Sequence, residues 1–155
     1  MRMIVAAVGR PKDEALATAI QEYEGRAARY WPLDVVEVRE ERGGGGTTPA
    51  LVKEREGERL SERIPPGVSL VACEATGTAM TSEQFAAWLQ DRREQAQDIA
   101  FVLGGAHGLS DTLRASAKTR LSFSPFTFPH ELARLLLAEQ LYRAGTIIRG
   151  EPYHK

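Results

Sequence analysis

Hydrophobic residues in this chain alternate between short continuous runs and longer stretches in which they recur at helical spacing. A short continuous apolar run is typical of a strand that is buried on both faces. Such runs occupy residues 3–8, 68–73 and 99–103, and a less apolar run at 34–38 is expected nearer a sheet edge. Helical spacing is found at residues 13–29, 48–63 and 82–95. The alternation predicts an α/β fold, with a parallel sheet covered on both faces by right-handed crossovers.

A run of four glycines, Gly43–Gly46, follows the charged segment Arg39–Arg42. Glycine has no side chain to pack and leaves the backbone great freedom, so we expect a flexible surface loop. A phosphate-binding P-loop would require Lys followed by Ser or Thr after the glycines, and that pair is missing.

Length and composition fit one compact domain over residues 1–155, because 43% of the 155 residues are hydrophobic. The single cysteine, Cys73, excludes a disulfide framework and a multi-cysteine zinc site. It suits a reducing compartment, so we expect a cytoplasmic protein. The first apolar run is too short for a signal peptide or a membrane span, and no membrane association is expected.

The net charge of −1 conceals two unlike parts. Residues 104–155 hold seven Lys/Arg against four Asp/Glu, whereas the first 103 residues hold 13 against 17. All three histidines lie in the basic part. Candidate chemistry is therefore expected there.

Three loops follow expected strands, at residues 73–77, 103–110 and 123–129. Ligands of open α/β sheets bind at the carboxyl ends of strands, so these loops would converge on one pocket if the strands are neighbours. Glycines at 104, 105 and 108 allow the backbone to approach a ligand closely. They do not form the G-x-G-x-x-G dinucleotide motif, and a tight strand-to-helix turn without a ligand is an equal alternative.

The segment Phe123–His130 contains two prolines and three phenylalanines. Prolines stiffen the loop and leave carbonyls free, while Phe126 and Phe128 offer flat apolar walls that could hold an adenine. The helix expected from His130 to Ala144 is apolar over most of its circumference, which indicates burial on both sides. We therefore expect a homodimer with two-fold symmetry.

Several single residues have ordinary structural interpretations. His130-Glu131 starts like the zinc-protease motif H-E-x-x-H, but Arg134 occupies the second ligand position and excludes it. His130 at a helix start is more often a structural hydrogen-bonder than a catalyst. Cys73 is expected to be a small core residue rather than a nucleophile. His107, between glycine-rich neighbours, is expected to be exposed.

The chain ends in Arg149-Gly150-Glu151-Pro152-Tyr153-His154-Lys155. An aromatic ring, an imidazole and a cation could stack on a base, exchange a proton and pair with phosphate. A solvated tail is the simpler alternative.

Taken together, these segments resemble the SPOUT class of knotted methyltransferases. More narrowly, the chain is similar to the ribosomal RNA large subunit methyltransferase H family, which methylates N3 of a pseudouridine in 23S rRNA. The similarity covers nearly the whole chain. The most specific segments are Leu103-Gly104-Gly105-x-x-Gly108-Leu109, Leu121–His130, Glu139-x-Leu141-Tyr142-Arg143-Ala144 and Pro152–Lys155.

The resemblance implies a C-terminal trefoil knot that binds S-adenosyl-L-methionine at a homodimer interface. It implies a set of cofactor residues: Cys73, Gly104, Gly105, Ser124, Pro125, Phe126, Thr127, Phe128 and Pro129. Family members usually carry leucine where this chain has Cys73, and a backbone contact would survive that difference.

N3 of a uracil-like ring must lose its proton before it attacks the sulfonium methyl, and no metal is needed. We assign Arg143 to a phosphate or the developing anion, Tyr153 to stacking or hydrogen bonding, and His154 to the base, with His130 as a second candidate base. The chain's weak net charge favours a substrate within the assembled ribosome over free RNA. The alternatives are a non-catalytic ribosome-binding or assembly factor and a SPOUT enzyme that modifies tRNA.

Overall fold

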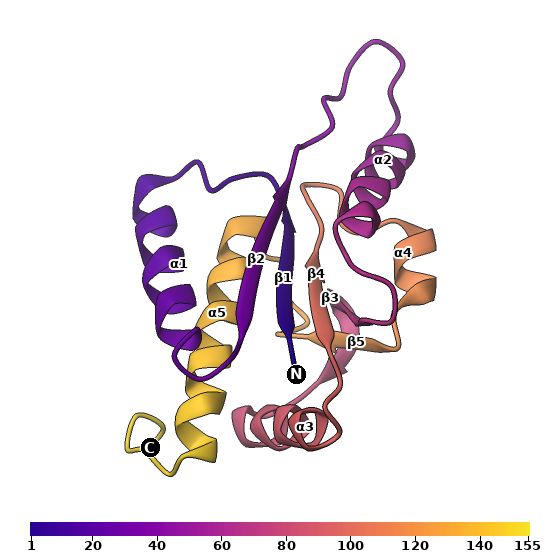
Figure 1. Cartoon of the computed structure of the whole chain (residues 1–155). Helices are drawn as coiled ribbons and strands as arrows, with labels where there is room; N and C mark the ends of the chain where they lie inside the picture. Colours follow the sequence, from indigo (N-terminus) through magenta and orange to yellow (C-terminus); the bar gives the residue numbers. More distant parts are fainter.

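The computed structural model describes all 155 residues and contains a five-stranded, fully parallel sheet in the order β2-β1-β4-β3-β5 (Figure 1). The strands are β1 (Met3–Val8), β2 (Leu33–Val38), β3 (Ser69–Ala79), β4 (Ile99–Leu103) and β5 (Thr119–Ser122). The helices are α1 (Glu14–Ala27), α2 (Pro49–Glu62), α3 (Ser82–Glu94), α4 (Asp111–Ser116) and α5 (His130–Ile148). The predicted parallel α/β fold is confirmed.

Helices cover both faces of the sheet, and each face has its own core (Figure 1). Alternate residues of β1 and β4 point to opposite faces, so Val5 and Phe101 join one core and Ala6 and Val102 the other. The larger core packs against α1, α3 and α5. The smaller one packs against α2 and α4. Burial on both faces explains why these strands read as continuous apolar runs.

Four of the helices begin directly after a residue whose side chain caps the first turn. Asp13, Thr48, Thr81 and Ser110 each accept a hydrogen bond from the backbone N–H three residues later. Thr81 also belongs to a full capping box. These bonds satisfy amide groups that a helix leaves free at its first turn.

Two elements are longer than the sequence pattern predicts. The expected strand at 68–73 continues to Ala79, because after a register shift Thr78 and Ala79 pair with β5. The expected helix His130–Ala144 continues to Ile148. The strand order is consistent with a trefoil knot, and the knot itself stays a prediction.

Helix α5 lies on the sheet between α1 and α3. In the second turn of this helix, the buried Arg134 binds Glu24 of α1 and Glu37 of β2, each at 2.7 Å. Loss of one partner from such a buried ion pair leaves an uncompensated charge and is strongly destabilising. Arg134 therefore fixes the position of α5 relative to α1 and β2.

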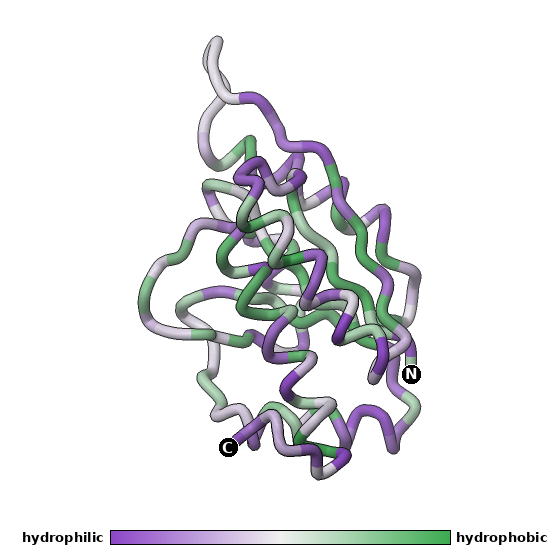
Figure 2. Tube along the Cα trace, turned by 90° about the vertical axis from the view of Figure 1, so that its left-hand side faces the viewer, coloured by the Kyte–Doolittle hydropathy of each residue, from purple (hydrophilic) through white to green (hydrophobic).

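The expected glycine loop at 43–46 is exposed and extends past the end of β2, beyond the body of the protein (Figures 1 and 2). No helix of the chain combines the length and apolar character that a membrane span requires.

Candidate active site

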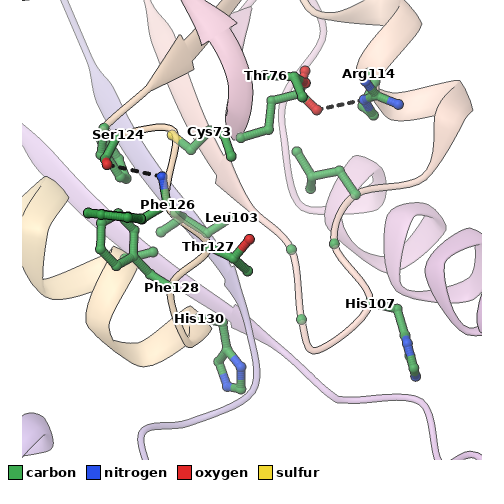
Figure 3. A pocket seen from close by; sticks show the side chains of 18 of the residues that line it. Cys73, Thr76, Leu103, His107, Arg114, Ser124, Phe126, Thr127, Phe128 and His130 are labelled. Atoms are coloured by element: carbon green, nitrogen blue, oxygen red, sulfur yellow. Dashed lines mark hydrogen bonds and ion pairs between the residues drawn. The ribbon is translucent and has the colours of Figure 1, made fainter. Parts of the chain in front are cut away.

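A cavity of about 370 Å³ opens at the carboxyl end of β4, between residues 73–76 in the middle of β3 and the loops that follow β4 and β5 (Figure 3). The three predicted segments therefore converge, but residues 73–77 are not a loop: they lie within β3, where its pairing with β5 shifts register between Cys73 and Thr78. Of the predicted cofactor residues, seven line the cavity: Cys73, Gly104, Gly105, Ser124, Phe126, Thr127 and Phe128. Pro125 and Pro129 belong to the same loop but are not among the lining residues, and both are exposed.

The glycine loop after β4 is a tight turn that has no room for side chains. A Cβ atom at Gly104 would collide with the backbone of Gly108, and one at Gly105 would lie 3.0 Å from Oε1 of Glu56. Gly108 has a φ of +84°, which side chains rarely tolerate. The loop thus presents backbone rather than side chains to the cavity.

The aromatic loop after β5 forms the opposite wall (Figure 3). The backbone N–H of Phe126 donates to Oγ of Ser124 at 3.1 Å, which shapes the turn. Ser122 donates to the carbonyl of Ala75 at 2.9 Å and so ties this loop to the middle of β3. The ring of Phe126 is 77% exposed, an unusual position for a large apolar side chain.

A charged wall, which the sequence pattern did not reveal, completes the cavity. The carboxylate of Glu74 binds Nε of Arg114 at 2.6 Å and also binds Arg120. Arg120 donates to Thr76 as well, at 2.8 Å. Because one carboxylate faces two guanidinium groups and Lys53 adds another cation, this wall is basic.

Glu56 is a second residue that sequence reasoning missed. It is 3% exposed; its Oε2 accepts from the backbone N–H of Glu41 at 3.1 Å, and its Oε1 has no partner. Burial raises the pKa of this carboxyl group. The only hint in the sequence is Gly57, which lets α2 approach Ser110.

Two candidate nucleophiles or bases lie at the cavity. Desolvation raises the pKa of the Cys73 thiol, so the thiol stays protonated and a nucleophilic role is not favoured. His130 is half-buried at the first turn of α5, and its Nε2 makes no hydrogen bond. The same atom lies 3.8 Å from Oε1 of Glu40. His107 is exposed at the mouth, as expected.

The other three catalytic candidates form a cluster at the opposite end of α5. Arg143 binds Oε1 of Glu139 at 2.5 Å, and Tyr153 donates to the same oxygen at 2.9 Å. The Tyr153 ring packs on Tyr142 with 4.5 Å between ring centroids. Burial and the bond to Glu139 raise the pKa of Tyr153, so its phenol remains a hydrogen-bond donor.

His154 bridges this cluster to α3. Arg143 has only donors, so Nδ1 of His154 accepts from it at 3.2 Å, while Nε2 lies 2.8 Å from Oε1 of Glu83. These contacts assign the neutral tautomer with its proton on Nε2. In this arrangement both ring nitrogens are engaged, and Nδ1 must be released from Arg143 before His154 can act as a base.

The tail does not reach the cavity of its own chain. Thirteen residues of α5 separate His130 from Arg143, which corresponds to about 20 Å along the helix axis. Of the four catalytic candidates, the structure places only His130 at the cavity.

No group of three or more His, Cys, Asp or Glu side chains is arranged to hold a metal ion.

Comparisons with known proteins agree with this architecture. The family model described as "Predicted SPOUT methyltransferase" matches residues 1–154. A solved structure titled a probable methyltransferase from Bordetella pertussis Tohama I shares the fold, with a TM-score of 0.59 at 15% identity. That similarity covers 92% of this chain and 95% of the other. Fold and pocket thus define a methyltransferase of the SPOUT class.

Closer relatives narrow this assignment. "Ribosomal RNA large subunit methyltransferase H" of Gemmatimonas aurantiaca is 57% identical over 155 residues, which cover all of both chains. The protein of the same name from Geobacter sp. strain M21 is 44% identical, with 99% of each chain covered. The chain belongs to the ribosomal RNA large subunit methyltransferase H family, and the predicted family is confirmed.

Proposed function

We propose that this protein transfers a methyl group from S-adenosyl-L-methionine to N3 of a pseudouridine in 23S rRNA, on assembled ribosomes in the cytoplasm. The observation that carries this proposal is the cavity walled by Cys73, the glycine loop and the aromatic loop, in a full-length member of this family. The name of the relatives supports a substrate in the large ribosomal subunit.

The residues at the cavity suit the proposed cofactor. Backbone groups of Gly104 and Gly105 can approach a ligand without obstruction, and Phe126 and Phe128 provide flat surfaces for an adenine ring. A volume of about 370 Å³ lies in the usual range of small-molecule sites. S-adenosyl-L-methionine supplies an electrophilic methyl group when bound, and the chain's own residues position the nucleophile and stabilise charge.

The proposed chemistry divides its tasks among the tail residues. N3–H of the target ring is a weak acid, comparable with a tyrosine phenol, so a nearby cation and a base are both useful. Arg143 would stabilise the anion or hold an adjacent phosphate, and Tyr153 would stack or donate a hydrogen bond. His154, with Nδ1 released from Arg143, would accept the N3 proton, with His130 as the second candidate base.

Separation of the tail from the cavity supports a homodimer. If two chains pack through α5 about a two-fold axis perpendicular to the helix, the helices run in opposite directions, and the tail end of one chain lies near the pocket end of the other. An apolar groove beside α5 is available for such contact, lined by Met80, Phe85, Leu121, Phe123 and Leu136 together with Ser82, Ser122 and Gln140. The exposed Phe126 lies nearby, on the loop that follows β5. A solution mass equal to the 17.1 kDa monomer at micromolar concentration would contradict the dimer.

Mass mapping of rRNA nucleosides tests substrate and position together. A strain lacking this chain should lose one N3-methylpseudouridine from 23S rRNA and regain it when the gene is restored. Calorimetry with S-adenosyl-L-methionine should show binding to the purified protein. Absence of binding would favour a non-catalytic ribosome-binding factor, and loss of a tRNA methylation instead would favour a tRNA enzyme.

A further inference from the structure

The loop between β2 and α2 touches the site described so far only through Glu40, which lies 3.8 Å from His130, and through the backbone N–H of Glu41, which donates to Glu56. We call residues 39–47 the glycine arm: a stem, Arg39–Arg42, and a tip, Gly43–Gly46 with Thr47. The arm follows the carboxyl end of β2, so it rises from the same edge of the sheet at which the cavity opens (Figure 1). Its position makes contact with a substrate at the cavity feasible.

The base of the arm is rich in cations. Five basic side chains surround it (Lys12, Arg39, Arg42, Arg55 and Arg59), against two acidic ones, Glu40 and Glu41. Arg55 and Arg59 share Glu41, and Lys12 lies 3.5 Å from Glu40. The side chains of Arg39 and Arg42 are exposed and form no ion pair, so they remain available to an outside anion.

A hollow of about 560 Å³ lies at the stem, and no apolar side chain lines it. A protein segment or a lipid surface would need apolar anchors, which this surface does not offer. Arginine guanidinium groups suit phosphate well because they donate two parallel hydrogen bonds. The surface therefore fits a phosphate backbone.

The stem is fixed to the wall of the cavity. The backbone N–H of Glu41 donates to Glu56, whose free oxygen faces Gly105, and Arg59 donates to the carbonyl of Arg39 at 2.9 Å. Lys53, on the helix that follows the arm, lines the cavity itself. A line of cations thus runs from the cavity mouth to the stem.

The tip, in contrast, is free of neighbours. Cβ atoms built at all four glycines meet nothing within 4 Å, and Gly44, Gly45 and Gly46 have φ values of +115°, +57° and +88°. A segment without side chains lets its backbone amides come close to a charged polymer.

We propose that the glycine arm binds the phosphate backbone of the RNA substrate next to the target nucleotide. This rests on the proposed function for the class of substrate. The arm supplies affinity, while the tail and the cavity carry the chemistry.

The test compares Arg39→Glu/Arg42→Glu with a control of equal charge change, Arg63→Glu/Lys118→Glu. The control residues are exposed, form no ion pair and lie near the opposite edge of the sheet. Binding to ribosomes from a strain lacking this chain is measured by sedimentation at several salt concentrations. Methyl transfer to the same ribosomes and calorimetry with S-adenosyl-L-methionine are measured in parallel.

The arm variant should bind ribosomes at least tenfold more weakly at about 0.1 M salt, and its slope of log affinity against log salt should fall by roughly 1.5 to 2. Cofactor affinity and the methyl-transfer rate at saturating ribosomes should stay at the wild-type level, and the control should behave as the wild type. Equal binding by the arm variant and the wild type overturns the proposal. Weaker binding with an unchanged salt slope also overturns it, because the contact would then be with a ribosomal protein.

Failure of the proposed function has a different signature. If the wild type binds ribosomes but transfers no methyl group, the enzymatic assignment is wrong. The proposal for the arm is then still tested by the affinity of the Arg39→Glu/Arg42→Glu variant for ribosomes.

Discussion

The two ends of α5 differ in how their polar groups are satisfied. At the pocket end, Oε1 of Glu56 and Nε2 of His130 are buried without hydrogen-bond partners, and Phe126 is exposed. At the tail end, Glu139 holds both Arg143 and Tyr153, and His154 is engaged at both ring nitrogens. Unpaired buried groups are costly and cluster where a ligand completes them. The pocket end thus has hydrogen-bonding groups free for a ligand, whereas the polar groups of the tail end are satisfied by one another and by Glu83.

Deletion of Tyr153–Lys155 should have the largest effect. Methyl transfer should fall by more than a hundredfold because the proposed base and stacking ring are removed, while cofactor affinity stays within about twofold. Single-turnover transfer and calorimetry measure the two quantities. Unchanged turnover would show that the two ends do not act together.

A mixture of two inactive variants tests whether the tail of one chain serves the pocket of another. A chain without its tail keeps an intact pocket, and a Gly104→Ala chain keeps an intact tail. If the tail serves the pocket of the partner subunit, an equimolar mixture that exchanges subunits should regain about a quarter of the wild-type sites. No recovery after verified exchange would place tail and pocket within one chain.

Gly104→Ala alone probes the pocket end. The added Cβ would collide with the Gly108 backbone, so the cofactor dissociation constant should rise at least tenfold in calorimetry. Gly43→Ala is the matched control, since a Cβ there meets nothing within 4 Å and φ is not positive. Equal affinity for the two variants would contradict the assigned wall.

Tyr153→Phe probes the tail end with a smaller change. It removes the hydrogen bond to Glu139 but keeps the ring on Tyr142. We expect a methyl-transfer rate about tenfold lower and a free energy of unfolding lower by about 1 kcal/mol. A rate equal to that of the wild type would limit Tyr153 to stacking.

Glu56→Gln should give the smallest effect. Burial raises the pKa of Glu56 in the folded state, so the fold prefers the protonated form, and stability falls as pH rises from the ordinary carboxyl pKa to the raised value. The variant should lose this part of the pH dependence and differ from the wild type by about 1 kcal/mol or less at pH 7. Urea unfolding at several pH values measures it, and identical pH profiles would contradict the assignment.

Much of the fold could be predicted because strands that are buried on both faces appear in the sequence as short continuous apolar runs. The second half of β3 escaped prediction because Thr76–Ala79 is neither continuously apolar nor alternating, and only pairing with β5 makes it a strand. The cavity walls were anticipated from loops that follow strands.

Other parts of the candidate site could not be foreseen. Glu56 lies in a highly charged run that is typical of an exposed helix face, and its burial depends on close approach at Gly57 and Gly105. The separation of His130 from Arg143 follows from the expected helix itself, whereas the return of the tail onto Tyr142 and Glu139 depends on α5 continuing four residues beyond its expected end.

Arg134 anchors α5 at one position along its length. Because Glu24 and Glu37 hold Arg134 in the second turn of the helix, the short pocket end and the long tail end extend by fixed lengths from one anchored point. One residue inserted between Arg134 and Arg143 would turn the tail by about 100° and move it by about 1.5 Å. The number of residues between Arg134 and the tail therefore sets where the tail lies, independently of which side chains cover the helix surface.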